Sequence, residues 1–230
     1  MKLRFLAWLP LLVLFVGCSA KKPPYIDMAE IQNRRKTGDP IIRIACIGDS
    51  ITFGAGVENR ETNNYPSKLN AMLGPRFLVQ NFGRSGATLS KVGDLPYWTT
   101  EEYRAATDSD PDVVIIQLGT NDTKPQNWRG KDAFKQDYKA LWEHFRGLKS
   151  HPKVWVCLPV PVYGEQWGIN APKLDEAIEC IQEVADREKI PVIDLNDALT
   201  GHPEFFPDKI HPNAKGAELM AKTVYQAIRP

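Results

Sequence analysis

Four short polar segments carry side chains of the types that perform nucleophilic and acid–base catalysis. They are Gly48–Gly54, Asn81–Gly86, Gly119–Asp122 and Asp208–Asn213. A serine hydroxyl becomes a good nucleophile only when a base takes its proton, and a neutral imidazole suits that role near pH 7. Taken alone, each segment has a plainer interpretation, because Gly, Asp, Asn and Ser are ordinary turn residues. The chemistry therefore depends on whether the fold brings the segments together.

Five apolar runs predict the strands that would position these segments. The runs are Ile41–Ile47, Phe77–Phe82, Val113–Leu118, Val154–Leu158 and Val192–Leu195. Such near-continuous apolar runs are typical of strands buried on both faces, as in parallel sheets. Helical periodicity fills the intervals over Tyr65–Leu73, Lys131–Leu148 and Ala171–Glu188, and Asn213 can cap a last helix that reaches Ile228.

Strands that alternate with helices predict an α/β fold with an open parallel sheet and right-handed crossovers. Ligands of such sheets bind at the carboxyl ends of the strands. Three of the polar segments directly follow a predicted strand, and the fourth precedes the last helix. We therefore expect all four segments at one edge of the sheet. Their joint occurrence is far less probable by chance than the occurrence of any one of them.

Together the four segments resemble the sequence blocks of the SGNH hydrolases, also called the GDSL family. The blocks occur in the family's order, and the resemblance covers the chain from about Ile41 to Ile228. It implies a three-layer α/β/α fold with a five-stranded parallel, flavodoxin-like sheet, in a domain of residues 41–230. It also implies Ser50 as nucleophile in a triad with His211 and Asp208, and a reaction without metal or organic cofactor.

The same resemblance implies an oxyanion hole made by the N–H groups of Ser50 and Gly86 and by the side-chain amide of Asn121. Gly83 competes with Gly86, which is favoured because the family glycine typically lies five residues after the asparagine that matches Asn81. The assigned roles suit the chemistry, because preorganised donors stabilise the oxyanion that forms on attack. The spacing of Asp208 and His211 lets one short loop carry both, and the carboxylate can hold the imidazole in the right tautomer.

The substrate is less well defined. The segments 118–128 and 167–170 resemble bacterial carbohydrate O-acetylesterases of the sialate and acetylxylan types, which implies hydrolysis of short O-acyl, chiefly O-acetyl, esters on a glycan through an acyl-enzyme. Arg84 could contact a polar substrate or stay solvated. Trp128 and Trp167 could stack on a sugar or pack their own loops, and both interpretations stay open.

Two other functions remain as alternatives. A lysophospholipase or thioesterase would need an apolar trough for a long acyl chain, and loop residues such as those from Trp128 to Lys131 are too polar to suggest one. An inert SGNH-like domain that only binds glycan would be expected to lack one of the four blocks. All four are present, which favours an enzyme.

The amino-acid composition argues against nucleic acid and a structural zinc ion as binding partners. The 230 residues are 43% hydrophobic and 25% charged, which is a globular composition. Lys and Arg number 29 against 28 Asp and Glu, so no basic excess exists to attract nucleic acid. The chain has 4 cysteines without a CxxC pair or a Cys/His cluster, which argues against a structural zinc site.

The N-terminus has the pattern of a bacterial lipoprotein signal. Lys2 and Arg4 precede an apolar run from Phe5 to Val16, which is too short to cross a bilayer of roughly 30 Å. The run ends at Gly17-Cys18 and resembles a lipobox, which implies a signal peptide over residues 1–17 and lipidation of Cys18. Residues 18–40 would then form a tether. We expect a protein exported across the inner membrane and lipid-anchored, periplasmic or at the cell surface of a bacterium.

Overall fold

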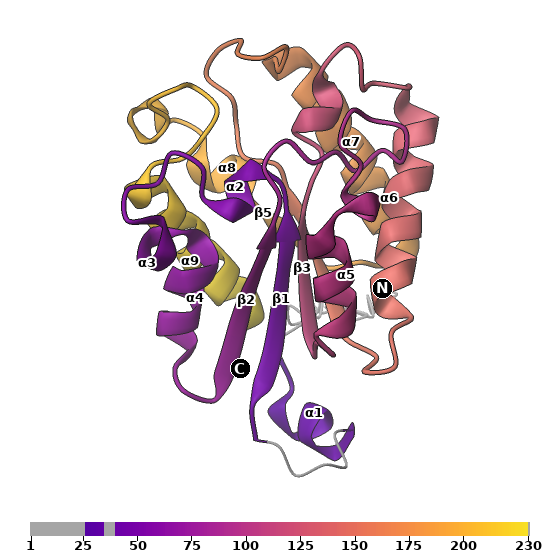
Figure 1. Ribbon diagram of the computed structural model, residues 1–230, viewed down its shortest axis with the longest axis vertical. Helices are drawn as coiled ribbons and strands as arrows, with labels where there is room; N and C mark the ends of the chain where they lie inside the picture. The colour runs from indigo at the N-terminus through magenta and orange to yellow at the C-terminus, as the bar shows by residue number, and fades with distance from the viewer. Residues whose placement is uncertain (1–25, 35–39, 230) are drawn as a thin grey trace, which may run out of the picture.

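The computed structural model describes residues 26–34 and 40–229, in which a five-stranded parallel sheet is covered on both faces by helices (Figure 1). The sheet order is β2-β1-β3-β4-β5, and each neighbouring pair is parallel. The strands are β1 (Ile42–Gly48), β2 (Phe77–Gly83), β3 (Val113–Gln117), β4 (Lys153–Leu158) and β5 (Val192–Asp194). The predicted three-layer α/β/α class and flavodoxin-like order are therefore confirmed.

The longer helices divide between the two faces of the sheet. One face carries α4 (Tyr65–Leu73), α8 (Leu195–Leu199) and α9 (Ala214–Ile228), and the other carries α5 (Glu101–Asp108), α6 (Lys131–Arg146) and α7 (Ala171–Glu188). Short helices α2 (Ser50–Phe53) and α3 (Arg60–Asn63) follow β1, and single 3-10 turns occupy Tyr97–Thr99, Asn121–Thr123 and Pro203–Phe205. The predicted fifth strand ends one residue early, because its last residue begins α8.

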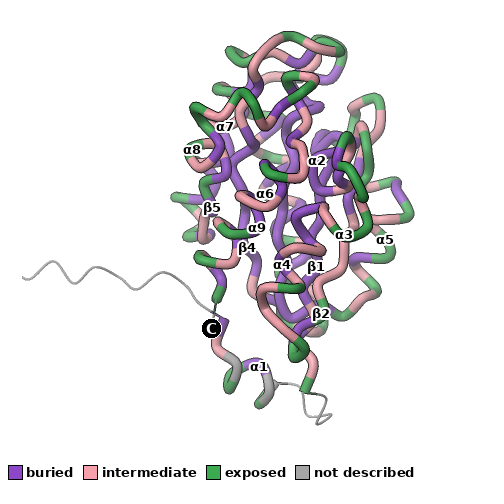
Figure 2. Tube along the Cα trace, turned by 90° about the vertical axis from the view of Figure 1, so that its left-hand side faces the viewer, coloured by how far each residue is buried: buried purple, intermediate pink, exposed green. Residues whose placement is uncertain are grey.

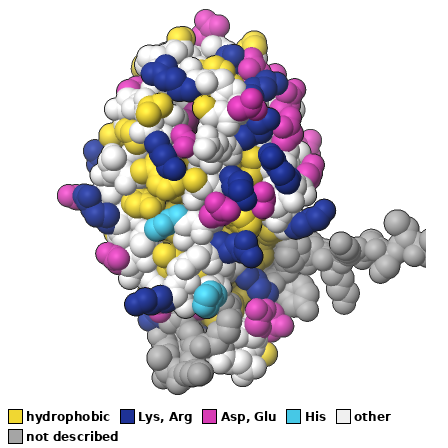
Figure 3. Space-filling model, turned by 90° about the vertical axis from the view of Figure 1, so that its right-hand side faces the viewer, with side chains coloured by type: hydrophobic (Ala, Val, Ile, Leu, Met, Phe, Trp, Pro, Cys, Tyr) yellow, Lys and Arg dark blue, Asp and Glu magenta, His cyan; other side chains and the backbone are white. Residues whose placement is uncertain are grey.

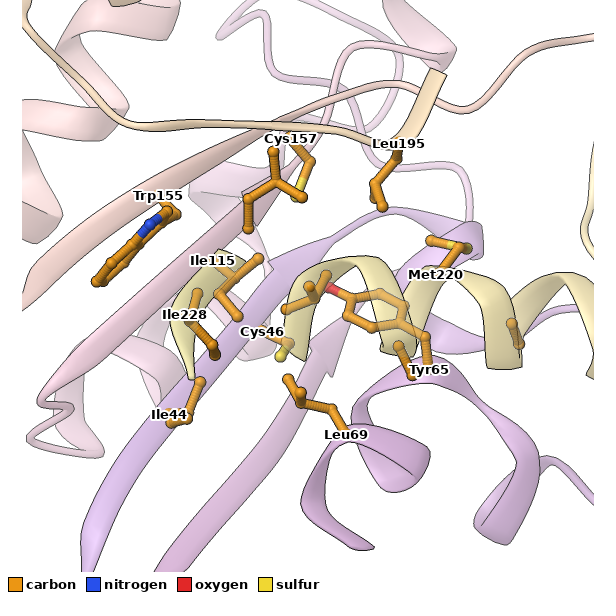
Figure 4. Close-up of a cluster of buried hydrophobic side chains, with 14 of the residues drawn as sticks. Ile44, Cys46, Tyr65, Leu69, Ile115, Trp155, Cys157, Leu195, Met220 and Ile228 are labelled. Atoms are coloured by element: carbon orange, nitrogen blue, oxygen red, sulfur yellow. The ribbon is translucent and has the colours of Figure 1, made fainter. Parts of the chain in front are cut away.

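The alternation of side chains along each strand builds two cores. In β1, Ile44 and Cys46 face α4 and α9, whereas Ala45 and Ile47 face the α5–α7 side, and all four are fully buried. Figure 4 shows the first core, in which Tyr65 of α4 lies among side chains of the sheet and of α9. Figure 2 shows the buried strands inside a shell of exposed helix surfaces and loops. Continuous burial on both faces explains why the strands were readable as apolar runs.

The outer surface of α6 and α7 is held by charge pairs. Lys131 bonds Glu179 at 2.7 Å and Lys135 bonds Glu183 at 2.9 Å, which links the two helices side by side. Figure 3 shows the two signs of charge interspersed on this side of the molecule. Exposed pairs of this kind each stabilise a fold by about 0–1 kcal/mol, so the apolar faces beneath them decide the packing.

Part of the predicted tether packs onto the domain. The helix α1 (Met28–Arg34) lies within it, with Ile26 and Ile31 buried and the Ile26 N–H bonded to the Ile228 carbonyl at 3.2 Å. Residues 26–34 are therefore not a free linker, because apolar side chains anchor them to the end of α9. The predicted signal peptide and Cys18 lie outside the described residues. Within residues 26–34 and 40–229, no helix is long and apolar enough to span a membrane.

Candidate active site

Ser50 follows the carboxyl end of β1, the strand between β2 and β3, as the first residue of α2. Asp49 caps that helix, because its Oδ1 accepts the Ile51 N–H at 2.9 Å. Gly48 is required just before, since a Cβ there would lie 2.1 Å from Thr52 Oγ1. This tight strand-to-helix turn places the Ser50 side chain in the lining of a surface cavity.

His211 and Asp208 reach Ser50 from one loop before α9. His211 Nε2 lies 2.8 Å from Ser50 Oγ, and His211 Nδ1 lies 2.7 Å from Asp208 Oδ2. The other carboxylate oxygen, Oδ1, accepts the N–H groups of His211 at 2.6 Å and Ile210 at 3.0 Å. Lys209 makes the tight turn between them with a φ of 71°. The structure thus brings together the three predicted triad residues, although they come from opposite ends of the chain.

The surroundings of Asp208 keep it ionised. Partial burial acts to raise the pKa of Asp208, but hydrogen bonds from His211 and Ile210 outweigh it, so that this pKa is lowered. An ionised carboxylate only accepts hydrogen bonds, so the proton of a neutral His211 lies on Nδ1. His211 Nε2 is then the acceptor for the Ser50 hydroxyl, which is the arrangement that a general base requires.

Two further predicted residues border the same cavity. Gly86 lines it with a φ of 84°, which is accessible to glycine without strain. Asn121 begins the 3-10 turn after β3 and also lines the cavity, and its Nδ2 donates to the Ala87 carbonyl at 3.2 Å. The amide has a second hydrogen, which is free to meet an oxyanion near Ser50.

The two competing glycines of the second block have different surroundings. Gly83 ends β2, and a Cβ there would lie 2.1 Å from the Phe53 nitrogen, so this glycine allows α2 to pack closely on the sheet. Gly86 lies three residues further on and lines the cavity. Asn81 links Gly83 to α2, because its Oδ1 accepts the Gly83 N–H at 2.9 Å while its Nδ2 donates to the Thr52 carbonyl at 2.8 Å. The favoured choice, Gly86, is the one at the cavity.

Two buried carboxyl groups support the site from below. Asp122 accepts the N–H groups of Leu89 at 2.9 Å and Ser90 at 2.7 Å, which fixes the loop that carries Gly86. Burial raises the pKa of Asp122 to about 6, against the effect of those bonds. Burial also raises the pKa of Asp49 to about 7, and its Oδ2 has no hydrogen-bond partner within the described structure. Both groups hold backbone and neither reaches the cavity lining.

The cavity is small and open on one side. Its volume is about 210 Å³, and it is lined by Ser50, Ala55, Ser85, Gly86, Asn121, Lys124, Trp167, Ile169 and His211. Lys124 and Ile169 lie within the segments 118–128 and 167–170 singled out above but were assigned no role, and Ala55 lies just outside the first polar segment. The positions of Lys124 and Ile169 near recognisable motifs were the only available signal, because neither residue type indicates chemistry by itself.

Trp167 reaches the cavity from a tight turn. Gln166 and Ile169 pair across it, with the Ile169 N–H donating to the Gln166 carbonyl at 2.8 Å, and both central residues, Trp167 and Gly168, have positive φ values of 53° and 82°. The indole is 58% exposed, and its ring centre lies 5.4 Å from that of His211. Ile169 secures the turn, because it packs with Ile210 in a small apolar cluster beneath the site.

Arg84 and Trp128, the other predicted substrate contacts, lie outside the cavity lining. Arg84 Nη1 pairs with Glu102 at 3.5 Å. Trp128 packs on Phe134 with ring centres 5.5 Å apart, and the ammonium of Lys173 lies 5.0 Å above its ring. Of the alternatives left open above, the structure shows an ion pair for Arg84 and packing of its own loop against α6 and α7 for Trp128.

The remaining histidine near the site, His202, is turned to other partners. Its Nδ1 contacts Glu204 at 3.0 Å and its ring stacks on Phe205. Across the described ranges, no group of three or more His, Cys, Asp or Glu side chains is arranged to hold a metal ion.

This chain belongs to the GDSL-like lipase/acylhydrolase family, whose model matches residues 46–219. It is 38% identical over 207 residues to an acetylxylan esterase of Xylanibacter ruminicola, a match that covers 82% of this chain and 43% of that protein. It is 25% identical over 116 residues to a multidomain esterase of Ruminococcus flavefaciens, covering 49% of this chain and 15% of that one. The chain thus spans less than half the length of these curated relatives.

Solved structures share the fold. An aryl esterase of M. smegmatis matches with a TM-score of 0.69 at 24% identity, over 80% of this chain and 97% of that one. A carbohydrate acetylesterase of Sinorhizobium meliloti, Est24, matches with a TM-score of 0.68 at 23% identity, again over 80% and 97%. The fold that the four sequence blocks implied is thus shared by these structures, and the family resemblance itself is confirmed by the family model.

Proposed function

We propose that this chain is a serine esterase that hydrolyses O-acetyl and other short O-acyl esters, with a carbohydrate as the alcohol. The observation that carries the proposal is the row of hydrogen bonds from Asp208 through His211 to Ser50, which opens onto a small cavity beside the Asn121 amide. Similarity to an acetylxylan esterase and to a carbohydrate acetylesterase supports the same class of substrate.

In the first half-reaction, Ser50 Oγ attacks the ester carbonyl carbon while its proton passes to His211 Nε2. The negative charge that forms on the carbonyl oxygen is met by the N–H groups of Ser50 and Gly86 and by the Asn121 amide. The C–O bond to the sugar then breaks, and His211 returns the proton to the departing alkoxide oxygen. Asp208 stabilises the imidazolium that exists between the two transfers.

The second half-reaction releases the acid. A water molecule attacks the acyl-Ser50 ester as His211 Nε2 takes its proton, and the same donors stabilise the second oxyanion. The bond between the acyl carbon and Ser50 Oγ breaks, and the proton on His211 returns to the serine oxygen. Acetate leaves, and the site is restored without any cofactor entering the balance.

The size of the cavity favours short acyl groups. Its volume of about 210 Å³ is below the range of roughly 300–1,000 Å³ typical of sites for drug-sized ligands. A long acyl chain would leave methylenes in water and lose about 0.8 kcal/mol for each CH₂ that a matched trough would bury. This argues against the lysophospholipase or thioesterase alternative.

The exposed indole of Trp167 supports a sugar as the alcohol component. A large aromatic side chain at a positive φ is uncommon, because most non-glycine residues lose about 1 kcal/mol or more there. Its packing does not repay that cost, since more than half of the residue is exposed. A flat apolar surface beside His211 can instead stack on a sugar ring, which also presents a flat apolar face.

The test compares p-nitrophenyl esters from acetate to octanoate with an acetylated xylo-oligosaccharide. We expect kcat/KM to be highest for acetate among the p-nitrophenyl esters and higher still for the oligosaccharide. Ser50→Ala should abolish both activities, while Ser67→Ala serves as the matched control, at a serine on α4 that donates to the Glu61 carbonyl of α3. A maximum at octanoate would favour the lipid-hydrolase alternative, and sugar binding without hydrolysis would favour the inert domain.

We also propose that the protein is anchored to a bacterial membrane by lipid on Cys18. The support is the sequence alone, namely a basic start, a short apolar run and a Gly17-Cys18 pair. Several acyl chains on one cysteine hold a protein to a bilayer, whereas one chain holds it weakly. Cys18→Ser should move the protein from the membrane to the soluble fraction, and equal membrane association of both forms would contradict lipidation.

A further inference from the structure

Lys124 places a positive charge at the cavity. It follows the 3-10 turn that begins at Asn121, and it lines the same cavity as Ser50 and His211. Neither aspartate nor glutamate is among the lining residues, so Lys124 is the fixed charge of that surface. An ammonium in a partly enclosed site gains more from an anionic partner than one on open surface does.

Two other cations near this edge, Arg84 and Lys173, have partners in the described structure. Arg84 pairs with Glu102 at 3.5 Å, and Lys173 pairs with Glu176 at 2.7 Å. No ion pair within 4.0 Å engages Lys124 among the described residues, and no hydrogen bond of its ammonium occurs there. Its charge is therefore available to a ligand, whereas the charges of Arg84 and Lys173 are paired with Glu102 and Glu176.

The backbone and stem of Lys124 are held in place. Its carbonyl accepts the N–H groups of Asn127 at 2.9 Å and Trp128 at 3.1 Å, which fixes the main chain after β3. Its side chain runs beneath the Trp167 turn, where a Cβ on Gly168 would lie 3.8 Å from Lys124 Cγ. The glycine thus lets the turn lie close to the lysine stem, and Trp167 and Lys124 both line the cavity.

We propose that Lys124 is a specificity-determining residue that binds a carboxylate on the acylated saccharide. The preferred substrate is then an O-acetyl ester on an acidic, carboxylated sugar chain. Trp167 stacks on a sugar face, while the ammonium pairs with the carboxylate of that sugar or of a neighbouring one. This inference rests on the proposed carbohydrate esterase function, since it specifies which saccharide the same site prefers.

A purely structural role for Lys124 has one physical basis, its attraction to the buried Asp49 carboxylate, which slightly lowers the pKa of that group. The two roles differ in their consequences. A lysine that supports Asp49 affects every substrate equally, whereas a lysine that binds a carboxylate affects only substrates that carry one.

The experiment measures kcat and KM on two matched pairs of substrates. One pair is an acetylated xylo-oligosaccharide with and without a glucuronic acid branch. The other is an O-acetylated sialic acid methyl glycoside and its carboxylate methyl ester. We expect the wild type to prefer the carboxylated member of one pair by roughly tenfold, mainly through KM. The pair that shows the preference identifies the source of the carboxylate.

Variants then assign that preference to the lysine. Lys124→Met should reduce the ratio of kcat/KM within the pair to about one, and Lys124→Arg should retain most of it. Lys222→Met removes the same charge from an ion pair with Glu218 on α9 and should keep the full ratio. Added salt should weaken the wild-type preference, since it screens the pairing of charges.

The outcomes separate this inference from the proposed function. Hydrolysis of both members of each pair at equal kcat/KM would overturn the role of Lys124 and leave the esterase proposal standing. An equal loss for both members in Lys124→Met would likewise overturn it in favour of the structural role. Hydrolysis of no acetylated sugar, with p-nitrophenyl acetate still cleaved in a Ser50-dependent way, would overturn both.

Discussion

Two segments border the cavity and are held in opposite ways. The loop from Asp208 to His211 is fixed by hydrogen bonds, since one carboxylate accepts two backbone N–H groups and the imidazole, and the Lys209 carbonyl accepts the Tyr163 N–H at 2.8 Å. The turn at Trp167 has fewer bonds in the described structure, namely its own pair of backbone bonds, an apolar anchor at Ile169 and the contact of the indole with the His211 ring. Groups that move protons are thus more tightly fixed than the surface proposed to meet the sugar.

Both segments contain a non-glycine residue with a positive φ, 71° at Lys209 and 53° at Trp167. At Lys209 the strained turn brings Asp208 back onto its own loop, so hydrogen bonds offset the cost. At Trp167 little in the structure offsets it, because the side chain is largely exposed. The difference suggests that one strain serves the chemistry and the other serves the choice of substrate. Changes to the first should alter kcat, and changes to the second should alter KM.

The largest effect is expected at the hydrogen-bonded loop. His211→Ala should lower kcat by about 10⁴-fold or more, and Asp208→Asn somewhat less, because triad members act as a unit. For the same reason the double variant should be scarcely slower than His211→Ala alone, which steady-state kinetics can measure. Additive losses in log kcat would show that the two residues are not partners. His202→Ala is the matched control and should keep near-normal kcat, since its ring contacts Glu204 and Phe205.

Asn121 is expected to show the next effect. Asn121→Ala should lower kcat by roughly 10²–10³ with little change in KM, because its amide acts only when charge develops on the carbonyl oxygen. Asn63→Ala removes the same group from α3, where it donates to the Glu58 carbonyl, and should leave the kinetics unaltered. If the Asn121 variant raised KM at constant kcat, the residue would be a ground-state contact instead.

The buried carboxyl of Asp49 should appear in the pH dependence of stability. Its pKa is raised by burial to about 7, so the folded state holds a proton that the unfolded state releases near pH 4. The free energy of unfolding should therefore fall as the pH rises from about 4 to about 7. Asp49→Asn keeps the cap on Ile51 N–H and should be more stable than the wild type at pH 8, by about 1–3 kcal/mol.

Urea denaturation at pH 5 and pH 8 measures that difference. The decrease in the free energy of unfolding from pH 5 to pH 8 should be smaller in Asp49→Asn than in the wild type. It should not vanish, because the pKa of Asp122 is also raised, to about 6. The exposed Asp197, replaced in the same way on α8, should leave the decrease unchanged. If Asp49→Asn showed the same pH dependence of the free energy of unfolding as the wild type, the Asp49 carboxyl would be neutral or paired throughout pH 5–8.

The fold was largely predictable because its signals are local. The range predicted for α7 matches residue for residue, and Asn213 caps α9 as expected, with its Oδ1 accepting the N–H groups of Lys215 and Gly216. The helix α5 was missed, because only Ala106 of its eight residues is fully buried and the apolar periodicity is correspondingly weak. Its N-cap, Thr100, followed by two acidic residues, was the signal that could have revealed it.

The candidate site was predictable only where residue types indicate chemistry. Motifs led to Ser50 and His211, although they lie 161 residues apart, because strand ends converge at one sheet edge. The residues that line the cavity could not be predicted from sequence motifs. Arg84 was considered as a possible substrate contact and pairs with Glu102, while Lys124 was assigned no role and lines the cavity. Which polar side chain faces a pocket depends on neighbours that are distant in sequence.

The smallest effect on stability, and the sharpest test of the comparison between the two segments, is expected at Trp167. Trp167→Asn would create an Asn-Gly pair with Gly168, which is the favoured choice where both central residues of a two-residue turn have positive φ. The free energy of unfolding should rise by up to about 1 kcal/mol, because Asn tolerates this conformation and the exposed indole contributes little packing. At the same time KM for the acetylated oligosaccharide should rise several-fold, and kcat should change far less. Denaturation and steady-state kinetics on one preparation measure both quantities.

The control for this prediction is Val92→Asn, which alters an exposed apolar residue away from the cavity lining and should leave KM unaltered. Trp98→Phe is a poor control, because the indole of Trp98 bonds the Leu89 carbonyl. A less stable Trp167→Asn protein with unchanged KM would make this indole a packing residue, and the turn would then serve the fold just as the Asp208 loop does.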